Sequence, residues 1–353
     1  MQFLLYGANG YTGRLIASLA EKYGLQPILA GRNENEIRLL ADQLKYPCRI
    51  MDLNNNEQLR KVLQETPLVL HAAGPFHRTA KPMMEACLQT NTHYLDITGE
   101  IPVFEMAKLY HNAAVKTGIM IMPGVGFDVV PTDCLSLFLK NILPDADQLT
   151  LAFASVGGGL SHGTAITMAE SLGEGSAARI NGKIIRTALG HKGMWVDFGA
   201  KKLFVMSIPW GDISTAYHTT GIKNIETFTG IAPYLYKLLK LQPLFNWALK
   251  TSTIRNYLKK KINQRPAGPS DEARLKGKSL VWGEVQNLAG KIMQARLSGP
   301  DGYTLTAHSS LIITQKVLSG YFRQGYQTPA SAYGADLILE VPGVTREIIE
   351  QAS

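Results

Sequence analysis

The strongest constraint on the fold of this chain is a glycine-rich turn within its first thirteen residues. Gly7, Gly10 and Gly13 are evenly spaced in the segment GANGYTG. The apolar run at 3–6 before the turn is typical of a buried parallel strand, and the apolar period from Thr12 onward is that of a helix. A strand, a glycine turn and a helix in this order predict the opening unit of a dinucleotide-binding α/β domain.

Each glycine of this turn has its own role in the prediction. Gly7 permits the tight turn, Gly10 lets backbone amides approach a pyrophosphate, and Gly13 lets the helix pack closely on the strand. The helix N-terminus offers unpaired N–H groups and a partial positive charge to the phosphates. The alternative is a plain strand-to-helix turn. The cofactor-binding residues expected here are Gly7, Ala8, Asn9, Gly10, Tyr11, Thr12 and Gly13.

Strand and helix patterns alternate through the first 125 residues. Helical periods are expected from 12 to a stop at Gly24, after Asn33, and at 57–64, 82–88 and 103–116. Further strands are expected at 27–30, 49–51, 68–73, 93–97 and 119–122. This alternation predicts right-handed crossovers and a doubly wound parallel Rossmann sheet, with its ligand at the carboxyl ends of the strands.

The residue at the tip of the second strand indicates which dinucleotide binds. An acidic residue there would hold a free ribose 2′-hydroxyl, but the sequence has Arg32 in the segment LAGRN. A guanidinium suits a 2′-phosphate, because its fork of donors matches phosphate oxygens and its planar face can stack on adenine. We therefore expect NADP(H) in preference to NAD(H), although NAD is possible. The alternative for Arg32 is a solvated surface arginine.

Other residues at the ends of these strands complete the expected cofactor site. Asn33 caps the helix after the second strand and lies beside Arg32. Asp52 could accept a hydrogen bond from the adenine amino group, or it could be the N-cap of the next helix. Ala73, Gly74 and Pro75 follow the fourth strand and would pass the ribose and nicotinamide.

Composition places few limits on function, but it locates the charge. A chain of 353 residues is long enough for two domains. Its net charge of +8 equals the eight basic residues between 231 and 265, where no acidic residue occurs. Three dispersed cysteines and eight histidines show no spacing for a disulfide framework or a metal site, so we expect no metal and a reducing, cytoplasmic location. No apolar run is long enough to span a bilayer, and no signal peptide is apparent.

The second half of the chain loses the alternation of strand and helix. Strands are expected at 149–155, 196–206 and 291–297, a glycine turn at 157–159, and a helix at 164–172. Few connections are long enough for crossovers, so we expect a second α+β domain with a mixed, mostly antiparallel sheet and helices on one face. The predicted boundaries are 1–125 for the Rossmann domain and 126–310 for the second domain, with 311–353 packing back on the first.

Five segments together resemble the saccharopine dehydrogenase-like oxidoreductases. These segments are GANGYTG, LAGR, AAGPF, HYLDITGE (93–100) and PGVGFDVVPTD (123–133), with weaker likeness at 210–212 and toward the end of the chain. The resemblance implies an N-terminal NAD(P)-binding Rossmann domain followed by a domain similar to that of glyceraldehyde-3-phosphate dehydrogenase. It also implies NADP-linked hydride transfer. The family includes saccharopine reductases, trans-acting enoyl reductases of lipid synthesis and members of unknown substrate, so the substrate class stays open.

Hydride transfer to a carbonyl or imine needs a proton donor near the nicotinamide. The catalytic candidates are Glu100, Asp128 and His77, because they follow strand ends or lie at the domain junction. Glu100 could instead be a helix N-terminal carboxylate, Asp128 could cap its turn, and His77 could be structural or exposed. Tyr94 and His162 are further candidates on the loops.

The basic segment 231–265 is helical and amphipathic. It could lie on an anionic membrane surface and meet a lipid-linked substrate. It could instead be a helical insertion that covers the sheet or a dimer partner, and we expect a homodimer. The segment lacks base-reading motifs, so we expect no nucleic-acid partner.

Two functions from different classes remain open at this point. The first is an NADP(H)-dependent oxidoreductase acting on a small-molecule or lipid-linked carbonyl, imine or enoyl substrate. The second is a nucleotide-binding sensor or membrane-associated scaffold that keeps the cofactor fold without turnover. The glycine turn cannot separate them, because it supports binding in both.

Overall fold

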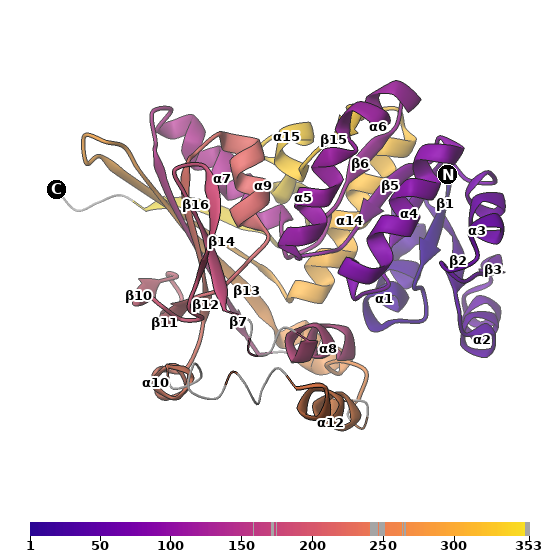
Figure 1. Ribbon diagram of the computed structural model, residues 1–353, viewed down its shortest axis with the longest axis horizontal. Coiled ribbons are helices and arrows are strands. Elements are labelled where there is room, and N and C mark those ends of the chain that lie inside the picture. Colours follow the sequence, from indigo (N-terminus) through magenta and orange to yellow (C-terminus); the bar gives the residue numbers. More distant parts are fainter. Residues whose placement is uncertain are drawn as a thin grey trace. The chain divides into compact units, whose positions relative to one another are not determined.

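The computed structural model describes residues 1–157, 159–170, 173, 175–240, 246, 251–262, 264 and 266–349. These residues form two compact units (Figure 1). The N-terminal unit consists of Met1–Val130 and Tyr303–Ala332, and the C-terminal unit consists of Pro131–Gly302 and the segment from Tyr333 onward.

The N-terminal unit contains a seven-stranded sheet in which every pairing is parallel. Its strand order is β3-β2-β1-β4-β5-β6-β15. The strands are β1 (Gln2–Tyr6), β2 (Gln26–Gly31), β3 (Cys48–Ile50), β4 (Leu68–His71), β5 (His93–Asp96), β6 (Met120–Met122) and β15 (Gly325–Tyr326). The predicted doubly wound sheet is confirmed. The order reverses between β1 and β4, so the ligand crevice of this topology lies outside the carboxyl ends of those two strands.

Helices cover both faces of this sheet (Figure 1). One face packs on α3 (Asn56–Leu63), α4 (Phe76–Thr90), α5 (Ile101–Leu109) and α6 (His111–Thr117), which contribute Leu59, Met83, Val103 and Ala114 to a buried cluster with Tyr6. The remaining helices are α1 (Tyr11–Leu19), the 3-10 helix η1 (Ala20–Tyr23), α2 (Glu34–Leu44), α14 (Gly302–Leu318) and α15 (Pro329–Tyr333). Tyr23 of η1 bonds His308 and Gln315 of α14, which ties the returning chain to the first crossover.

Two helix predictions in this unit were wrong in their bounds. The helix expected at 82–88 begins at Phe76, and Pro82 lies inside it. The single helix expected at 103–116 is two helices that meet at Tyr110. The stop at Gly24 is confirmed, because Gly24 has a φ of 65° and closes the helix by bonding to Ala20 and Glu21.

The C-terminal unit contains a mixed sheet, as predicted. The order along its main path is β10-β11-β12-β7-β13-β14-β16, with β8 pairing β12 and β9. Among the described strands of this unit, β7 and β12 are the one pair that runs parallel. The strands are β7 (Gln148–Val156), β8 (Ser176–Ile180), β9 (Lys183–Thr187), β10 (Gly193–Asp197), β11 (Lys202–Ser207), β12 (Asn224–Gly230), β13 (Lys278–Gln286), β14 (Ile292–Pro300) and β16 (Thr345–Ile349).

Two predictions for this half are corrected by the sheet. The strand expected at 196–206 is a hairpin, because β10 and β11 pair antiparallel around a turn at Gly199, whose φ is 85°. The segment 311–353 does not pack as one piece on the first domain. Residues up to Ala332 join the N-terminal unit, whereas β16 pairs with β14 in the C-terminal sheet.

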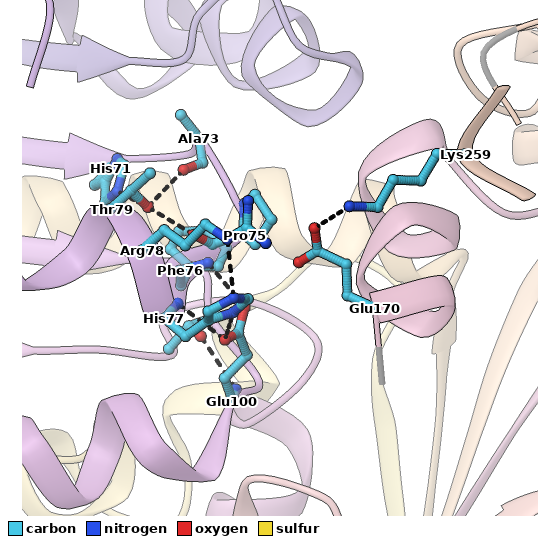
Figure 2. Close-up of polar contacts among 11 residues, drawn as sticks. His71, Ala73, Pro75, Phe76, His77, Arg78, Thr79, Glu100, Glu170 and Lys259 are labelled. Carbon is cyan, nitrogen blue, oxygen red and sulfur yellow. Dashed lines mark hydrogen bonds and ion pairs between the residues drawn. The ribbon is translucent and has the colours of Figure 1, made fainter. Parts of the chain in front are cut away.

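The helices of this unit are α7 (Val130–Ile142), α8 (His162–Glu170), α9 (Asp212–Thr220), α10 (Pro233–Leu239), α12 (Ser252–Ile262) and α13 (Asp271–Lys276), followed by the 3-10 helix η3 (Leu337–Glu340). Leu135 and Leu139 of α7 pack directly over Gly283 of β13, where an added Cβ would lie 2.8 Å from Leu139. Lys259 of α12 pairs with Glu170 of α8 at 2.5 Å (Figure 2).

Parts of three predicted features lie outside the described residues. These parts are Gly158 of the glycine turn, residues 171–172 at the end of the helix expected at 164–172, and residues 241–245, 247–250, 263 and 265 of the basic segment. The described part of the basic segment includes α10 and α12, and its helical character is confirmed there.

Candidate active site

The glycine turn after β1 has the geometry that its spacing predicts. Gly7 has a φ of 86°, and the N–H groups of Gly7 and Ala8 both donate to the carbonyl of Ala30. A Cβ on Gly13 would lie 2.3 Å from the Gly7 carbonyl oxygen, so only glycine lets α1 approach the turn this closely. The roles predicted for Gly7 and Gly13 are therefore confirmed.

Gly10 lies at the exposed side of the same turn. It is the N-cap residue of α1 and, as a glycine, has no side chain to cap that helix end. A Cβ on Gly10 would meet a single atom within 4 Å, the Gly7 carbonyl oxygen at 3.3 Å. The backbone amides at the start of α1, which belong to Tyr11, Thr12 and Gly13, thus face a surface that a phosphate could reach.

The turns after β1 and β4 are in direct contact. A Cβ on Gly7 would lie 2.8 Å from backbone atoms of Ala72 and Ala73. The structure therefore brings the GANGYTG turn and the segment Ala73-Gly74-Pro75 together at the reversal of strand order. This is the location expected for a dinucleotide that crosses from its adenosine half to its nicotinamide half.

The second strand ends at an unpaired cation. Arg32 is exposed and makes no hydrogen bond or ion pair with any described residue. Burial raises the pKa of Tyr6 to about 12, and the charges of Arg32 and Asp52 shift that pKa in opposite directions. The charges of Arg32 and Asp52 therefore both influence the carboxyl end of β1, where Tyr6 lies.

Two polar residues near this end have structural roles. Asn33 is the N-cap of α2, as predicted, and its side-chain oxygen accepts from the N–H of Glu36 at 3.3 Å. The proposed N-cap role of Asp52 is wrong, because Asn55 caps α3. Asp52 instead accepts from the backbone and side-chain nitrogens of Asn54, both at 2.9 Å.

Side chains of β4 and α4 hold the turn between these two elements (Figure 2). The hydroxyl of Thr79 reaches the carbonyl oxygens of Ala73 at 2.8 Å and Pro75 at 3.2 Å. His71, which is fully buried, bonds the same hydroxyl through Nε2 at 2.9 Å. The Gly74–Pro75 peptide is cis.

Glu100 caps the helix that follows this turn. Its carboxylate accepts from the backbone N–H groups of Phe76 at 2.8 Å and His77 at 2.9 Å, and from His77 Nδ1 at 2.9 Å (Figure 2). Phe76 and His77 are the first two residues of α4, so Glu100 satisfies N–H groups that a helix end leaves unpaired. The carboxylate that sequence singled out for proton transfer thus has three donors from one neighbouring segment.

Asp96 joins the loops that follow β5 and β6. Its fully buried carboxylate accepts from the Tyr94 hydroxyl at 2.6 Å and from the N–H groups of Thr98 and Gly124, both at 2.9 Å. Burial raises the pKa of Tyr94 well above its usual value, and this side chain is fully buried on Asp96. Tyr94 is therefore not placed to donate a proton to a ligand at the surface.

Asp128 differs from the other two carboxylates because it accepts no hydrogen bond from any described residue. It is half-buried, and a Cβ on Gly99 would lie 2.6 Å from its Oδ2, so the carboxylate lies against the backbone just beyond β5. Burial, and secondarily the charge of Glu100, raises its pKa to about 7. A carboxyl group with this pKa can give or take a proton at neutral pH.

The remaining candidates fall into two places. His77 is exposed and engaged with Glu100 in the N-terminal unit. His162 begins α8 in the C-terminal unit, where its N–H donates to the Ala267 carbonyl at 2.9 Å. Among the described residues no group of three or more histidine, cysteine or acidic side chains could hold a metal, and no helix is long and apolar enough to cross a membrane.

Three residues with clear roles at these turns were not predicted from the sequence. They are His71, Thr79 and Asp96, whose partners are given above. Asp96 carried a usable signal, because an acidic residue that ends an apolar strand of a parallel sheet lies at the ligand edge. His71 and Thr79 carried none, since their partners depend on the path of the Ala73–Pro75 turn.

The chain is similar to known oxidoreductases in both sequence and fold. Residues 3–122 match the family model for the saccharopine dehydrogenase NADP binding domain. A putative trans-acting enoyl reductase of Mycobacterium tuberculosis is 32% identical over 187 residues, which cover 49% of this chain and 44% of the relative. A probable mitochondrial saccharopine dehydrogenase-like oxidoreductase of Arabidopsis thaliana is 31% identical over 155 residues, 38% of this chain and 34% of the relative.

The fold of the whole chain also has a solved counterpart. The apo form of saccharopine dehydrogenase (L-Glu forming) from Saccharomyces cerevisiae matches with a TM-score of 0.65 at 13% identity, covering 99% of this chain and 100% of that one. At this identity the match describes the fold alone. The sequence matches span less than half the length of the two relatives above.

Proposed function

We propose that this chain, whose residues 3–122 match the family model for the saccharopine dehydrogenase NADP binding domain, is an NADP(H)-dependent oxidoreductase. In this proposal it transfers a hydride to or from a carbonyl, imine or enoyl group of a small-molecule or lipid-linked substrate. The observation that carries the proposal is the contact between the β1 and β4 turns at the reversal of strand order, together with the exposed Arg32, which has no partner among the described residues.

The residues at this edge fit NADP(H) along its length. The amides at the start of α1 and the open side of Gly10 would hold the pyrophosphate. Arg32 would pair with the 2′-phosphate, and the exposed Gly74 would let the nicotinamide half approach the end of β4. When bound, the cofactor supplies or accepts the hydride.

Asp128 is the residue that supports the accompanying proton transfer. Its protonated carboxyl would donate to the substrate atom that gains negative character during reduction, and its carboxylate would accept in the reverse direction. Glu100 and His77 are less suited to proton transfer, because they bond each other and Glu100 also accepts from the first two N–H groups of α4.

Substitution of Asp128 tests this assignment. Asp128→Asn removes the titrating group and should lower turnover with NADPH by about 100-fold, while NADPH affinity stays unchanged. The wild-type rate of reduction should fall as pH rises above about 7, because the carboxyl loses its proton there. Asp42→Asn, at an exposed position of α2, is the matched control. Full activity of Asp128→Asn with an unchanged pH profile would contradict the assignment.

Substitution of Arg32 tests cofactor choice. Arg32→Ala should weaken NADPH binding about tenfold and change NADH binding little, since only NADPH has the 2′-phosphate. Fluorescence titration of both reduced cofactors measures this directly. Arg38→Ala is the control, because Arg38 is exposed on α2 but pairs with Glu34 at 2.8 Å. Tighter binding of NADH than of NADPH by the wild-type protein would exclude the NADP(H) preference.

A nucleotide-binding sensor or scaffold without turnover is the second candidate. The observation that favours it is that Glu100 and His77 bond each other and the start of α4. Of the three catalytic candidates, this leaves Asp128 without a described hydrogen-bond partner. Oxidation of NADPH with a panel of aldehydes, imines and enoyl thioesters separates the candidates. Binding of NADPH without oxidation by any member of a broad panel would favour the sensor.

We also propose that the basic segment makes a peripheral contact with anionic membrane. The described part exposes apolar side chains next to lysines: Tyr234 and Leu238 on α10 are 65% and 61% exposed, and no acidic residue occurs from 231 to 265. Flotation with anionic and neutral vesicles at low salt tests this contact. Equal recovery with both kinds of vesicle, or none with either, would rule it out.

The homodimer and the cytoplasmic location remain proposals too. The exposed Trp195 of β10, 57% accessible, supports an association surface on the C-terminal unit. The three cysteines are free, which suits a reducing compartment, although the Arabidopsis relative is named mitochondrial. Sedimentation of the wild type and Trp195→Ser, and fractionation of cells, would test the two proposals separately.

A further inference from the structure

Glu36 joins the two turns that end β1 and β2. Its Oε2 accepts from Asn9 Nδ2 at 2.8 Å, and its Oε1 accepts from Asn33 Nδ2 at 2.6 Å. Asn9 belongs to the glycine turn, and Asn33 directly follows Arg32. A single exposed carboxylate therefore connects the pyrophosphate turn with the segment that carries the cation.

The residues around this carboxylate lie at the end of β2. Gly31 is the last residue of β2, and a Cβ there would lie 3.0 Å from Asn9 Oδ1 and 3.0 Å from Ile37. Asn9 thus lies across the end of β2, and Glu36 lies in the first turn of α2. In a doubly wound sheet this is the edge at which the adenosine ribose binds.

The chemistry of this edge contains two opposing charges. Arg32 favours a ribose 2′-phosphate, whereas a carboxylate beside the same ribose repels that dianion and accepts from a free 2′-hydroxyl. An ionised carboxylate has about four lone-pair sites. Two described donors, Asn9 and Asn33, use one site on each oxygen, so acceptor capacity remains for a hydroxyl.

We propose that Glu36 is a specificity-determining residue that lowers the preference for NADP(H) and lets NAD(H) compete. This inference rests on the proposed function, since it concerns the ribose end of the same cofactor site. Arg32 and Glu36 act in opposite senses on one quantity, the ratio of the dissociation constants for NADH and NADPH.

The test is titration of Glu36→Gln with NADPH and with NADH. Glutamine keeps the size and can still accept from one amide, but it removes the negative charge. NADPH affinity should rise by about fivefold and NADH affinity should fall by about twofold, as expected for an exposed charge beside the ribose. Glu34→Gln is the matched control, since Glu34 lies in the same helical turn but pairs with Arg38. That control should leave both constants unchanged.

The other outcomes are distinct. If Glu36→Gln weakens both cofactors equally, Glu36 only positions the turn and the inference is overturned. An unchanged ratio overturns it as well. If the wild-type protein binds neither cofactor, the proposed function fails on its own, whatever the variant does. Thermal unfolding of both variants with no cofactor present checks that neither change alters the fold.

Discussion

The turns after β1 and β4 lie side by side at the ligand edge, yet they are built in different ways. The β1 turn is specified by its own glycines. A Cβ added to Gly13 would lie 2.3 Å from the Gly7 carbonyl oxygen. The β4 turn is held by side chains, Thr79 from α4 and Glu100 from beyond β5. The first is a local structure, and the second depends on residues up to 24 positions away.

The two helix starts that follow these turns show what the difference means for function. Both α1 and α4 begin at the ligand edge, and the first N–H groups of a helix have no acceptor within the helix, so both helix starts favour an anion. At α4 the protein supplies the anion itself, because Glu100 accepts from the first two residues. At α1 the N-cap residue is Gly10, which has no side chain to accept from the helix, so the anion can come from a cofactor.

The largest effect is expected from closing the space inside the β1 turn. Gly13→Ala places a methyl group against backbone atoms that cannot move aside, so the free energy of unfolding should fall by about 3 kcal/mol. Urea denaturation measures this loss. Because α1 must shift, NADPH binding should weaken in the same variant.

Gly10→Ala is the matched change on the open side of the turn. Its φ of −70° is ordinary for alanine, and the added Cβ meets one atom at 3.3 Å. Unfolding should change by less than about 1 kcal/mol, while NADPH affinity falls at least tenfold because the methyl group takes the place of a phosphate oxygen. Equal loss of stability in Gly10→Ala and Gly13→Ala would show that the space next to Gly10 is as restricted as the space next to Gly13.

The β4 turn should respond to a change made far from it in sequence. Glu100→Gln removes the charge that caps α4 and leaves its first two N–H groups with a weaker acceptor. The free energy of unfolding should fall by about 2 kcal/mol, which is the upper range for loss of a helix cap. Chemical denaturation and hydrogen exchange at Phe76 and His77 measure the effect.

The control for this change is Glu105→Gln on α5. Glu105 is a surface carboxylate that pairs with Lys108 at 2.7 Å, and its removal should alter stability by less than about 0.5 kcal/mol. If Glu100→Gln keeps full stability but loses turnover, Glu100 acts in catalysis and the structural account of the β4 turn is wrong.

The same contrast explains how far the sequence could predict this site. Asn33 and the close approach of Gly13 to Gly7 were predicted correctly, because these contacts involve residues three and six positions apart. The start of α4 was placed at Pro82, which is a common first-turn residue. It begins at Phe76 because Glu100 stabilises that end, and no local pattern reports a partner 24 residues away.

The C-terminal unit shows the same limit on a larger scale. The strand at 149–155 was predicted from its alternation, but β8, β9, β12, β13 and β16 were missed. Strand β16 (Thr345–Ile349) is mostly exposed, so it lacks an alternating pattern, and it is a strand because it pairs with β14 about fifty residues earlier. The return of 333–349 to this sheet depended on that pairing.

The smallest expected difference between the two turns is in their response to acid. His71 holds Thr79 at the β4 turn, and burial lowers its pKa to about 3. Because this folded pKa lies below the value of about 6.5 in the unfolded chain, the unfolded chain binds the proton first. The stability that His71 contributes is present above pH 6.5 and is lost as pH falls toward 3. Between pH 6 and pH 5 the loss should be about 1 kcal/mol.

His71→Gln should therefore flatten the dependence of unfolding free energy on pH in this interval by about 1 kcal/mol. His93, whose pKa burial lowers to about 4, should maintain part of the remaining slope. Gly13→Ala should keep the wild-type slope although it is less stable, because the β1 turn contains no group that titrates in this range. If the unfolding free energy of His71→Gln depends on pH as steeply as that of the wild type, His71 is not the source of acid sensitivity at the β4 turn.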